Sequence, residues 1–229
     1  MLFFLPDFEN PVLPETEARH ALQVLRMKKG DSLQVSNGKG GLAEAVIVSE
    51  SISACKVQLT EIKHFTKPQQ GEIFLAVAPT KNADRMEWLV EKGTELGCGG
   101  FHFFRSKRTE RNHLNLERLE KIALSAMKQS GQYFLPEIYW HKILSDVPLN
   151  DFDRIITADL SAAENKLKEI PFNKMLLLIG PEGDFTPEEL QWLAGKSTET
   201  VRFLPQVLRT ETAALYALTL AMVSGRGPE

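Results

Sequence analysis

The sequence predicts an α/β protein in two parts, a small β-barrel followed by a larger, mainly parallel sheet covered by helices. Residues 1–64 alternate short apolar runs with turn signals, a pattern typical of strands joined by hairpins. From residue 72 onwards, strand-like and helix-like segments alternate, as they do in a parallel sheet. The Pro- and Gly-containing stretch between these parts predicts a linker, so we place the domains at residues 1–67 and 68–229.

The first part combines strands with one short helix. Within residues 15–31, Ala18, Ala21 and Leu25 recur on one face, which predicts the helix. Asn37-Gly38 is the clearest turn signal in this region and indicates a hairpin. A small barrel with one helix is therefore the expected architecture.

The second part reads as strands and helices in the order β-α-β-α-β-β-α-β-α. Its central strand segments lack polar alternation, as expected when both faces of a sheet are covered. A mainly parallel, helix-covered sheet follows from this order. The expected strands span residues 73–79, 101–104, 154–160, 175–180 and 203–207, and the expected helices span residues 84–97, 114–131 and 211–224, with a further helix from Pro187.

The loop Gly180-Pro181-Glu182-Gly183 follows a buried strand directly, where α/β proteins hold ligands. It is a poor phosphate site, because Pro181 lacks an N–H and Glu182 places an anion where a phosphate would lie. A neutral or cationic ligand suits it better, and S-adenosylmethionine, a sulfonium without phosphate, is such a ligand. A tight turn between a strand and a helix explains this loop equally well. Thr186 and Glu189 then form a capping box that starts the next helix.

A second segment, Leu208 to Ala213, reads LRTETA and precedes a final helix that is apolar on nearly all sides. Together the two segments resemble the signature of the SPOUT class of methyltransferases, in particular the RsmE-type 16S ribosomal RNA uridine-N3 methyltransferases, which carry GPEGG and LRTETA. The resemblance covers nearly the whole chain in order. Its other matches are His20, Val24-Leu25-Arg26, Gly30-Asp31, Asn37-Gly38, Lys81, Arg85, Glu87-Trp88, Lys92, Thr94 to Gly97, Gln129-Ser130-Gly131 and Pro136.

The chain departs from this family pattern at several positions. Asp184 and Leu204 stand where the family usually has glycine, and both belong to the expected cofactor site. Lys128 replaces an acidic residue, and Gln132 replaces an arginine that could contact RNA. The amino-terminal arginine common in the family is missing from the first eight residues.

The resemblance implies a SPOUT-type domain with a deep trefoil knot, preceded by a PUA-like barrel that binds RNA. It further implies a cytoplasmic homodimer that uses S-adenosylmethionine to methylate N3 of a uridine in 16S ribosomal RNA of the small subunit. Two alternatives stay open: a SPOUT methyltransferase acting on another RNA such as tRNA, and a non-catalytic RNA-binding factor for ribosome assembly. The knot would bring the Gly180 loop and the segment from Leu204 onwards around one cofactor.

The resemblance also assigns roles to individual residues. Arg209 is the candidate to stabilise the anion that develops on the uracil ring, because its charge is permanent; an ion pair with Glu182 or Glu211 is the structural alternative. Glu182 is the candidate general base, or it orients the loop. Glu211 lies where a helix dipole favours a carboxylate. The expected cofactor-binding residues are Leu178, Ile179, Gly180, Pro181, Glu182, Gly183, Leu204, Gln206, Val207, Leu208, Thr210 and Ala213.

The net charge of −3 speaks against indiscriminate nucleic-acid binding, yet residues 71–142 carry 11 Lys and Arg against 9 Asp and Glu. Much of this excess lies in residues 105–113, which read either as a solvated loop or as phosphate contacts. The expected RNA-binding residues are Arg26, Lys28, Lys29, Arg105, Lys107, Arg108 and Arg111. His20 could face RNA, but a surface histidine on a short helix is more often neither a ligand nor a catalyst.

Composition excludes several other classes of protein. An apolar content of 43% with 25% charged residues is ordinary for a soluble globular chain. Cys55 and Cys98 are the only cysteines and lie far apart, which argues against a disulfide framework and a zinc site. The longest near-apolar run, residues 213–223, is too short to span a bilayer, and the first ten residues do not read as a signal peptide. We therefore expect an intracellular protein without a metal or a membrane partner.

Overall fold

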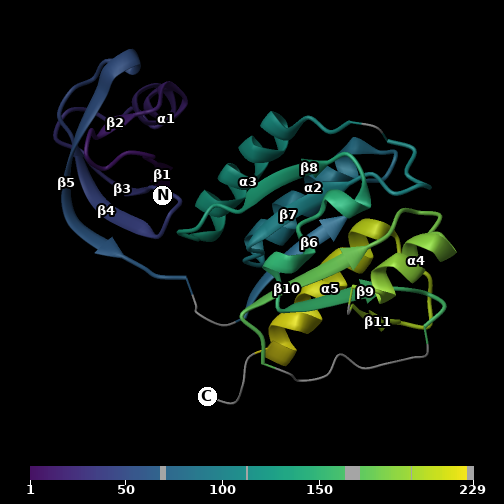
Figure 1. Ribbon diagram of the computed structural model, residues 1–229. Helices are drawn as coiled ribbons and strands as arrows, with labels where there is room; N and C mark the ends of the chain where they lie inside the picture. The colour runs from purple at the N-terminus through teal and green to yellow at the C-terminus, as the bar shows by residue number, and fades with distance from the viewer. Residues whose placement is uncertain (68–70, 112, 163–170, 197, 226–229) are drawn as a thin grey trace. The chain divides into compact units, whose positions relative to one another are not determined.

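The computed structural model describes residues 1–67, 71–111, 113–162, 171–196 and 198–225 (Figure 1). The chain forms two compact units. One unit comprises Met1–Lys67 together with Leu124–Leu135, and the other comprises Pro68–Ala123 and Pro136–Glu229. A segment from the middle of the chain therefore belongs to the amino-terminal unit.

The first unit is built on a five-stranded sheet in the order β1-β3-β4-β5-β2. β1 and β3 are parallel and the remaining pairs are antiparallel. The predicted helix is present but is short, because it continues as a π-helical segment. Ala18 and Ala21 are buried in the core, as expected, whereas Leu25 is exposed. The bounds are β1 Leu2–Phe4, β2 Val12–Leu13, α1 Glu15–Arg19, the π-helical segment His20–Val24, β3 Ser32–Ser36, β4 Gly41–Ile47, a 3₁₀ turn Ile52–Ala54 and β5 Cys55–His64.

The turn at Asn37-Gly38 docks on the segment Leu124–Leu135. Leu135 N donates to Gly38 O (2.8 Å), and Gly40 N donates to Tyr133 O (2.9 Å). Gly40 has a φ of +91°, and a Cβ there would lie 2.3 Å from the carbonyl oxygen of Phe65. Only glycine therefore fits this approach. The predicted turn thus serves as the attachment point for a segment distant in sequence.

Lys128 departs from the family pattern, and the structure shows why the change is tolerated. Its Nζ forms an ion pair with the carboxylate of Glu17, whose side chain is buried in the same unit. Glu17 also accepts a hydrogen bond from Phe4 N (3.2 Å). Because a buried carboxylate needs a cation or hydrogen-bond donors, Lys128 neutralises a charge that an acidic residue at this position would aggravate.

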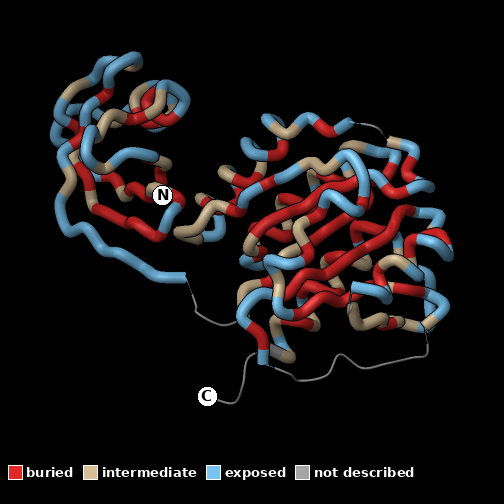
Figure 2. Tube along the Cα trace, in the orientation of Figure 1, coloured by how far each residue is buried: buried red, intermediate tan, exposed pale blue. Residues whose placement is uncertain are grey.

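The second unit contains a six-stranded sheet in the order β11-β9-β10-β6-β7-β8, and all its pairs are parallel. The inner strands are buried on both faces (Figure 2), as their apolar sequences predict. The strands are β6 Glu72–Val77, β7 Gly100–Phe104, β8 Glu137–His141, β9 Arg154–Ala158, β10 Lys174–Ile179 and β11 Glu199–Val201.

Two strands differ from the prediction. β8 was not expected, because its five residues lie at the sheet edge and mix polar with apolar side chains. The last strand lies at Glu199–Val201, where it pairs with β9, and not at residues 203–207. Pro205 has no backbone N–H to donate to a neighbouring strand. The side chain of Arg202 donates hydrogen bonds to the carbonyl oxygens of Leu204 and Pro205 (3.3 and 2.7 Å). Residues 203–209 are therefore free of the sheet.

Helices cover both faces of this sheet (Figure 1). α4 packs on the face that carries Leu176 and Leu178, through Leu193. α5 packs on the other face against β6, β10 and α2. The capping box of α4 is confirmed, with Thr186 Oγ1 accepting from Glu189 N (3.3 Å) and Glu189 Oε2 accepting from Thr186 N (2.9 Å). The helices are α2 Ala83–Glu95, α3 Leu116–Ser130, α4 Pro187–Ala194 and α5 Thr210–Gly225, with 3₁₀ turns at Leu144–Asp146 and Leu149–Asp151.

A histidine pair connects the edge strand β8 to β7. Nδ1 of His102 and Nε2 of His141 lie 3.0 Å apart, and the rings stack. Burial, and to a smaller extent the neighbouring His141, lowers the pKa of His102 to about 4. His102 is therefore neutral at neutral pH, and the contact is a hydrogen bond between neutral rings.

Candidate active site

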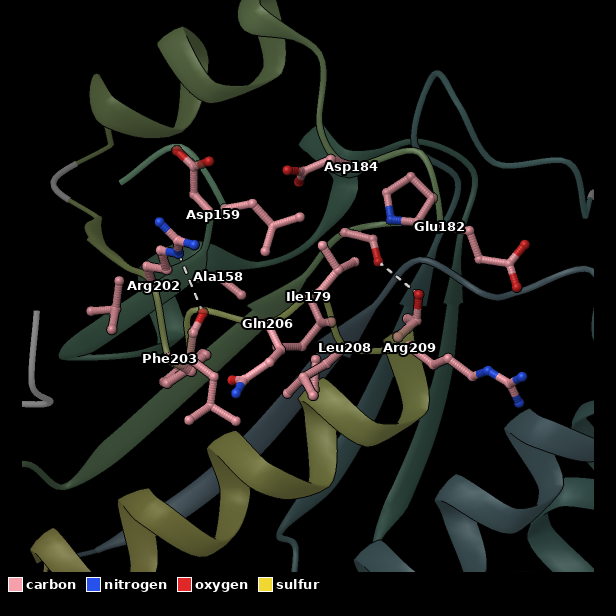
Figure 3. Close-up of a pocket in the computed structure, with 18 of the residues that line it drawn as sticks. Ala158, Asp159, Ile179, Glu182, Asp184, Arg202, Phe203, Gln206, Leu208 and Arg209 are labelled. Carbon is pink, nitrogen blue, oxygen red and sulfur yellow. Dashed lines mark hydrogen bonds between the residues drawn. The ribbon is translucent and has the colours of Figure 1, made fainter. Parts of the chain in front are cut away.

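A cavity of about 440 Å³ lies at the carboxyl ends of β9, β10 and β11 (Figure 3). This edge is where parallel α/β sheets bind ligands. Three segments that follow these strands form most of its wall, and Arg85 of α2 and Ala213 of α5 complete it. The cavity is contained entirely within the second unit.

The two signature segments share this cavity, as the sequence analysis expected. Thr210 Oγ1 donates a hydrogen bond to Gly180 O (3.3 Å), and both residues line the cavity. Thr210 is buried and is the first residue of α5. The start of the last helix is thus held against the loop after β10.

Most of the expected cofactor-binding residues lie in the wall. Leu178 is completely buried in the core of the α4 face, one position before the wall begins. Gly183 faces away, and a Cβ there would contact the side chain of Arg108 at 3.4 Å. The residues that line the cavity are Ile179, Gly180, Pro181, Glu182, Leu204, Gln206, Val207, Leu208, Thr210 and Ala213.

Several wall residues were missed. Asp159 and Leu160 follow β9 in the same way that Gly180 follows β10. The rule that ligands bind at the carboxyl ends of neighbouring strands could have identified them. Arg85 could not be found by this rule, because it belongs to α2 and its approach depends on packing against α5. The remaining missed residues are Ala158, Val201, Arg202 and Phe203, whereas Asp184 was expected at this site and lines the cavity.

Asp184, which replaces a family glycine, has a left-handed backbone with a φ of 60°. Its N–H donates to Pro181 O (2.9 Å), and its Oδ1 accepts from Phe185 N (2.8 Å), so it closes the turn. Glycine is favoured in this conformation, and Asp and Asn are the side-chain-bearing residues that tolerate it best. Leu204, the other departure, is not among the described residues with positive φ, so its position does not require glycine.

Two carboxylates, those of Asp159 and Asp184, lie on one side of the cavity (Figure 3). Asp159 is buried, and its Oδ1 accepts from the N–H and the hydroxyl of Ser161, each at 2.8 Å. Burial raises the pKa of Asp184, and the negative charge of Asp159 adds to this effect. The pair disfavours a phosphate in this region and favours a cationic ligand group.

Arg85 bridges the two signature segments electrostatically. Its Nη1 lies 2.9 Å from Glu182 Oε1, and its Nε lies 3.6 Å from Glu211 Oε1. Glu211 is buried, and its Oε2 has no hydrogen-bond partner in the described part of the chain. Glu182 and Glu211 thus use Arg85 as their common cation.

Arg209 is exposed, and the structural alternative considered for it is wrong. No ion pair of Arg209 with Glu182 or Glu211 is found in the described residues, because both carboxylates face Arg85. Arg209 O accepts from Ala213 N (2.8 Å), so its backbone is fixed by α5. Its side chain extends from the same end of the cavity as that of Glu182 (Figure 3). Among the residues that the structure describes, the guanidinium of Arg209 thus has no ion-pair partner at this end of the cavity.

The expected RNA-binding residues divide into two groups. Arg108 and Arg111 fix loops, since Arg108 donates to Gly183 O (2.6 Å) and Arg111 donates to the carbonyls of Thr80 and Lys81 (3.1 Å each). The others have exposed side chains. These are Arg26, Lys28 and Lys29 of the first unit and Arg105 and Lys107 of the second.

The described part of the chain offers neither a metal site nor a membrane-spanning helix. In the described ranges of the chain, no group of three or more His, Cys, Asp or Glu is arranged to hold a metal ion. Among the same residues, no helix has the length and apolar content that crossing a membrane requires. Cys55 and Cys98 are both buried free thiols.

Comparison with known proteins identifies both parts of the chain. An RNA methyltransferase domain family matches residues 66–222, and an RNA methyltransferase PUA domain family matches residues 13–60. The ribosomal RNA small subunit methyltransferase E of Bacillus subtilis is 30% identical over an alignment 223 residues long, which covers 89% of this chain and 86% of that protein. A protein of the same name from Rickettsia conorii is 29% identical over 88% of this chain and 84% of its own.

Solved structures agree over almost the full length. A probable rRNA-methyltransferase from Porphyromonas gingivalis is 36% identical, with a TM-score of 0.86 and 98% of each chain covered. The small subunit methyltransferase E of Neisseria gonorrhoeae, solved bound to S-adenosyl methionine, shares the fold at 24% identity, with a TM-score of 0.83 and 97% and 96% of the chains covered. The chain therefore belongs to the RNA methyltransferase family that includes the ribosomal RNA small subunit methyltransferases E.

Proposed function

We propose that this protein transfers a methyl group from S-adenosylmethionine to N3 of a uridine in 16S ribosomal RNA of the small subunit. The observation that carries the proposal is the cavity in which the Gly180 loop and the segment up to Thr210 meet. Family membership supplies the reaction class, and the relatives' name supplies the substrate. Because that substrate is ribosomal RNA, we place the enzyme in the cytoplasm.

The cavity suits S-adenosylmethionine better than a nucleotide with phosphates. Asp159 and Asp184 offer negative charge to a ligand that carries a sulfonium and an ammonium group. Leu204, Val207 and Leu208 contribute apolar wall, and backbone groups of the three loops that line the cavity can read an adenine edge. When bound, this cofactor supplies a methyl carbon that is electrophilic because it is attached to a sulfonium.

The protein's part in the reaction is to align the uridine, exclude water and stabilise charge. The N3 proton must leave, so negative charge develops on the uracil ring. Arg209 is placed to stabilise that charge, because its guanidinium is unpaired among the described residues and stands at the cavity mouth. Glu182 is held by Arg85, and we assign it to orienting the loop.

Arg209→Ala should lower kcat roughly a hundredfold to a thousandfold, the usual cost of one electrostatic donor at a reacting centre. The Kd for S-adenosylmethionine, measured by calorimetry, should stay unchanged. Arg118→Ala is the matched control, because it breaks an exposed ion pair with Glu87 outside the cavity. Turnover of Arg209→Ala close to that of the wild type would remove Arg209 from the mechanism.

We propose that residues 1–67 serve as the RNA-binding domain and residues 68–229 as the methyltransferase domain. The PUA family match over residues 13–60 supports the first assignment, and the exposed cations Arg26, Lys28 and Lys29 supply phosphate contacts. Segment 124–135 packs with the first domain and is part of its structure.

Replacing Lys28 and Lys29 together by Glu should weaken binding to small subunits in a filter assay. The affinity should also fall less steeply as the salt concentration rises. Unaltered binding would contradict this role.

We further propose that the enzyme is a homodimer whose interface includes α2 and α5. These helices pack on each other and carry the exposed apolar side chains of Trp88 and Val223 (45% and 71% exposed). Val207, at 77% exposure, adds an apolar residue at the cavity wall. Such side chains are typical of a surface that a second protein covers.

Trp88→Glu should convert the dimer into a monomer in size-exclusion chromatography with light scattering, because the charge cannot be buried at the interface. The rate of methyl transfer should fall as the fraction of dimer falls. Ile62→Glu, at an exposed apolar position of the first unit, is the control and should change neither. A monomeric wild-type protein would refute the proposal directly.

We also propose that the second domain carries the trefoil knot of SPOUT enzymes. The chain leaves the sheet after β11, passes along the Gly180 loop and enters α5, whose first residue is bonded to that loop. An experimental trace in which residues 203–209 can be withdrawn without crossing the loop at residues 180–186 would overturn the knot.

The decisive test of the function is the state of one nucleotide. Mass-spectrometric mapping of ribosomal RNA from cells lacking this protein should show a single missing 3-methyluridine in 16S RNA. The purified enzyme with S-adenosylmethionine should restore it on small subunits from those cells. Methylation of tRNA instead would favour another SPOUT specificity, and absence of saturable cofactor binding would favour a non-catalytic assembly factor.

A further inference from the structure

A second cavity, of about 530 Å³, lies at the same carboxyl edge of the sheet, beyond β7 and β8. One wall begins at Arg105, directly after β7, and a second wall is the turn at Ile143–Ser145, which follows β8. α4 forms the third wall through Glu188, Glu189 and Trp192. Arg105 N donates to His141 O (3.3 Å), so the ends of the two strands are joined beneath the cavity.

The inner surface of this cavity is largely apolar. Leu144 is buried, Ile143 is 52% exposed, and the indole of Trp192 is half-buried against the core. Lys196 Nζ lies 5.5 Å from the centre of the Trp192 ring. An indole, an exposed isoleucine and a buried leucine together offer a flat apolar surface of the kind on which an aromatic ligand packs.

The rim of the cavity carries two cations, Arg105 and Lys107, and one exposed carboxylate, Glu188. The Arg105 side chain has no ion pair with any described residue, and Lys107 has only a long, exposed contact with Glu188 (3.6 Å). Such an exposed pair is weak and easily exchanged. Glu189 is buried and is satisfied by Ser106 Oγ, Lys107 N and Thr186 N, at 2.9 to 3.1 Å. The carboxylate that faces inwards is therefore occupied, and the cations are available to an anionic ligand.

One continuous segment, the loop after β10 and the α4 helix that follows it, lines both this second cavity and the proposed cofactor cavity. The loop after β10 lines the cofactor cavity up to Asp184, and the helix that it enters lines the second cavity from Glu188. Arg108 fastens the intervening residues through Gly183 O and Phe185 O. β7 lies two strands from β10 in the sheet, which corresponds to roughly 10 Å at an interstrand spacing of about 4.8 Å. One strand of RNA crossing this edge can reach both cavities.

We propose that the second cavity binds an unpaired base of the RNA substrate that flanks the methylated uridine. The base stacks on Trp192 and Ile143, and Arg105 and Lys107 hold the adjoining phosphates. RNA is read mostly through unstacked bases of loops, which bind aromatic side chains and arginines. The inference rests on the proposed function, and adds to it a single-stranded context around the target.

The test compares two substitutions in the second cavity with matched controls in the full-length protein. Ser145→Trp fills the cavity from an exposed turn position, and Arg105→Glu reverses the rim charge. The matched controls are Asn150→Trp and Lys174→Glu. They make the same kinds of change at exposed positions near the amino ends of the strands, before β9 and at the start of β10. The substrate is small subunits from cells lacking the enzyme, and the readouts are methyl transfer and the Kd for S-adenosylmethionine.

Both cavity variants should raise KM for small subunits about tenfold or more, the effect of losing one stacked base, with the cofactor Kd unchanged. Arg105→Lys keeps the positive charge, so its KM for small subunits should lie much closer to the wild-type value than that of Arg105→Glu. The two control variants should behave as the wild type. Wild-type KM in both Ser145→Trp and Arg105→Glu would overturn the proposal.

Two further outcomes separate the possible failures. If the wild-type enzyme binds cofactor but methylates no small subunit, the proposed function fails; binding of the variants to naked 16S RNA then tests the cavity alone, and equal affinities would refute it. If Ser145→Trp weakens binding to intact subunits but not to naked RNA, the cavity holds a ribosomal protein, and the base-binding assignment is wrong.

Discussion

The contact between Thr210 and Gly180 is the constraint on which the cavity at the ends of β9, β10 and β11 depends. It joins the first residue of the last helix to the loop after β10, and so closes a space that neither segment forms alone. Arg85 reinforces this junction by pairing with Glu182 on one side and Glu211 on the other. A buried carboxylate without a cation is costly, so the three side chains stabilise the closed arrangement together. Loss of Arg85 would leave two like charges at the junction.

Much of the architecture could be predicted from local sequence, because local patterns determine it. The sequence alone predicts the apolar runs at β9 and β10, the capping box of Thr186 and Glu189 and the turn at Asn37-Gly38, and the structure has all of them. The short edge strand β8 was missed, since an edge strand needs no continuous apolar run. The last strand was misplaced by a few residues because Pro205 and the bonds of Arg202 keep residues 203–207 out of the sheet.

The site was predictable where chemistry follows from neighbouring residues, and not where it depends on tertiary contacts. The two signature segments were expected to share one cavity, and they do. An ion pair of Arg209 with Glu182 was only the structural alternative from the sequence, and the cation that pairs with Glu182 is Arg85, from a helix about a hundred residues earlier. Asp159 was missed because β9 carries no motif after it. The sequence also could not show that the side chains of Arg108 and Arg111 donate hydrogen bonds to carbonyl oxygens of loops.

Asp184 shows how the chain can differ from its relatives at a demanding position. The left-handed backbone there, with a φ of 60°, admits few residue types. A glycine codon that ends in a pyrimidine becomes an aspartate codon by one base change, so a tolerated replacement lies a single mutational step away. The same step adds a negative charge beside Asp159 in the cofactor cavity. Asp184 thus changes the charge of the cavity while its backbone still closes the turn with Pro181.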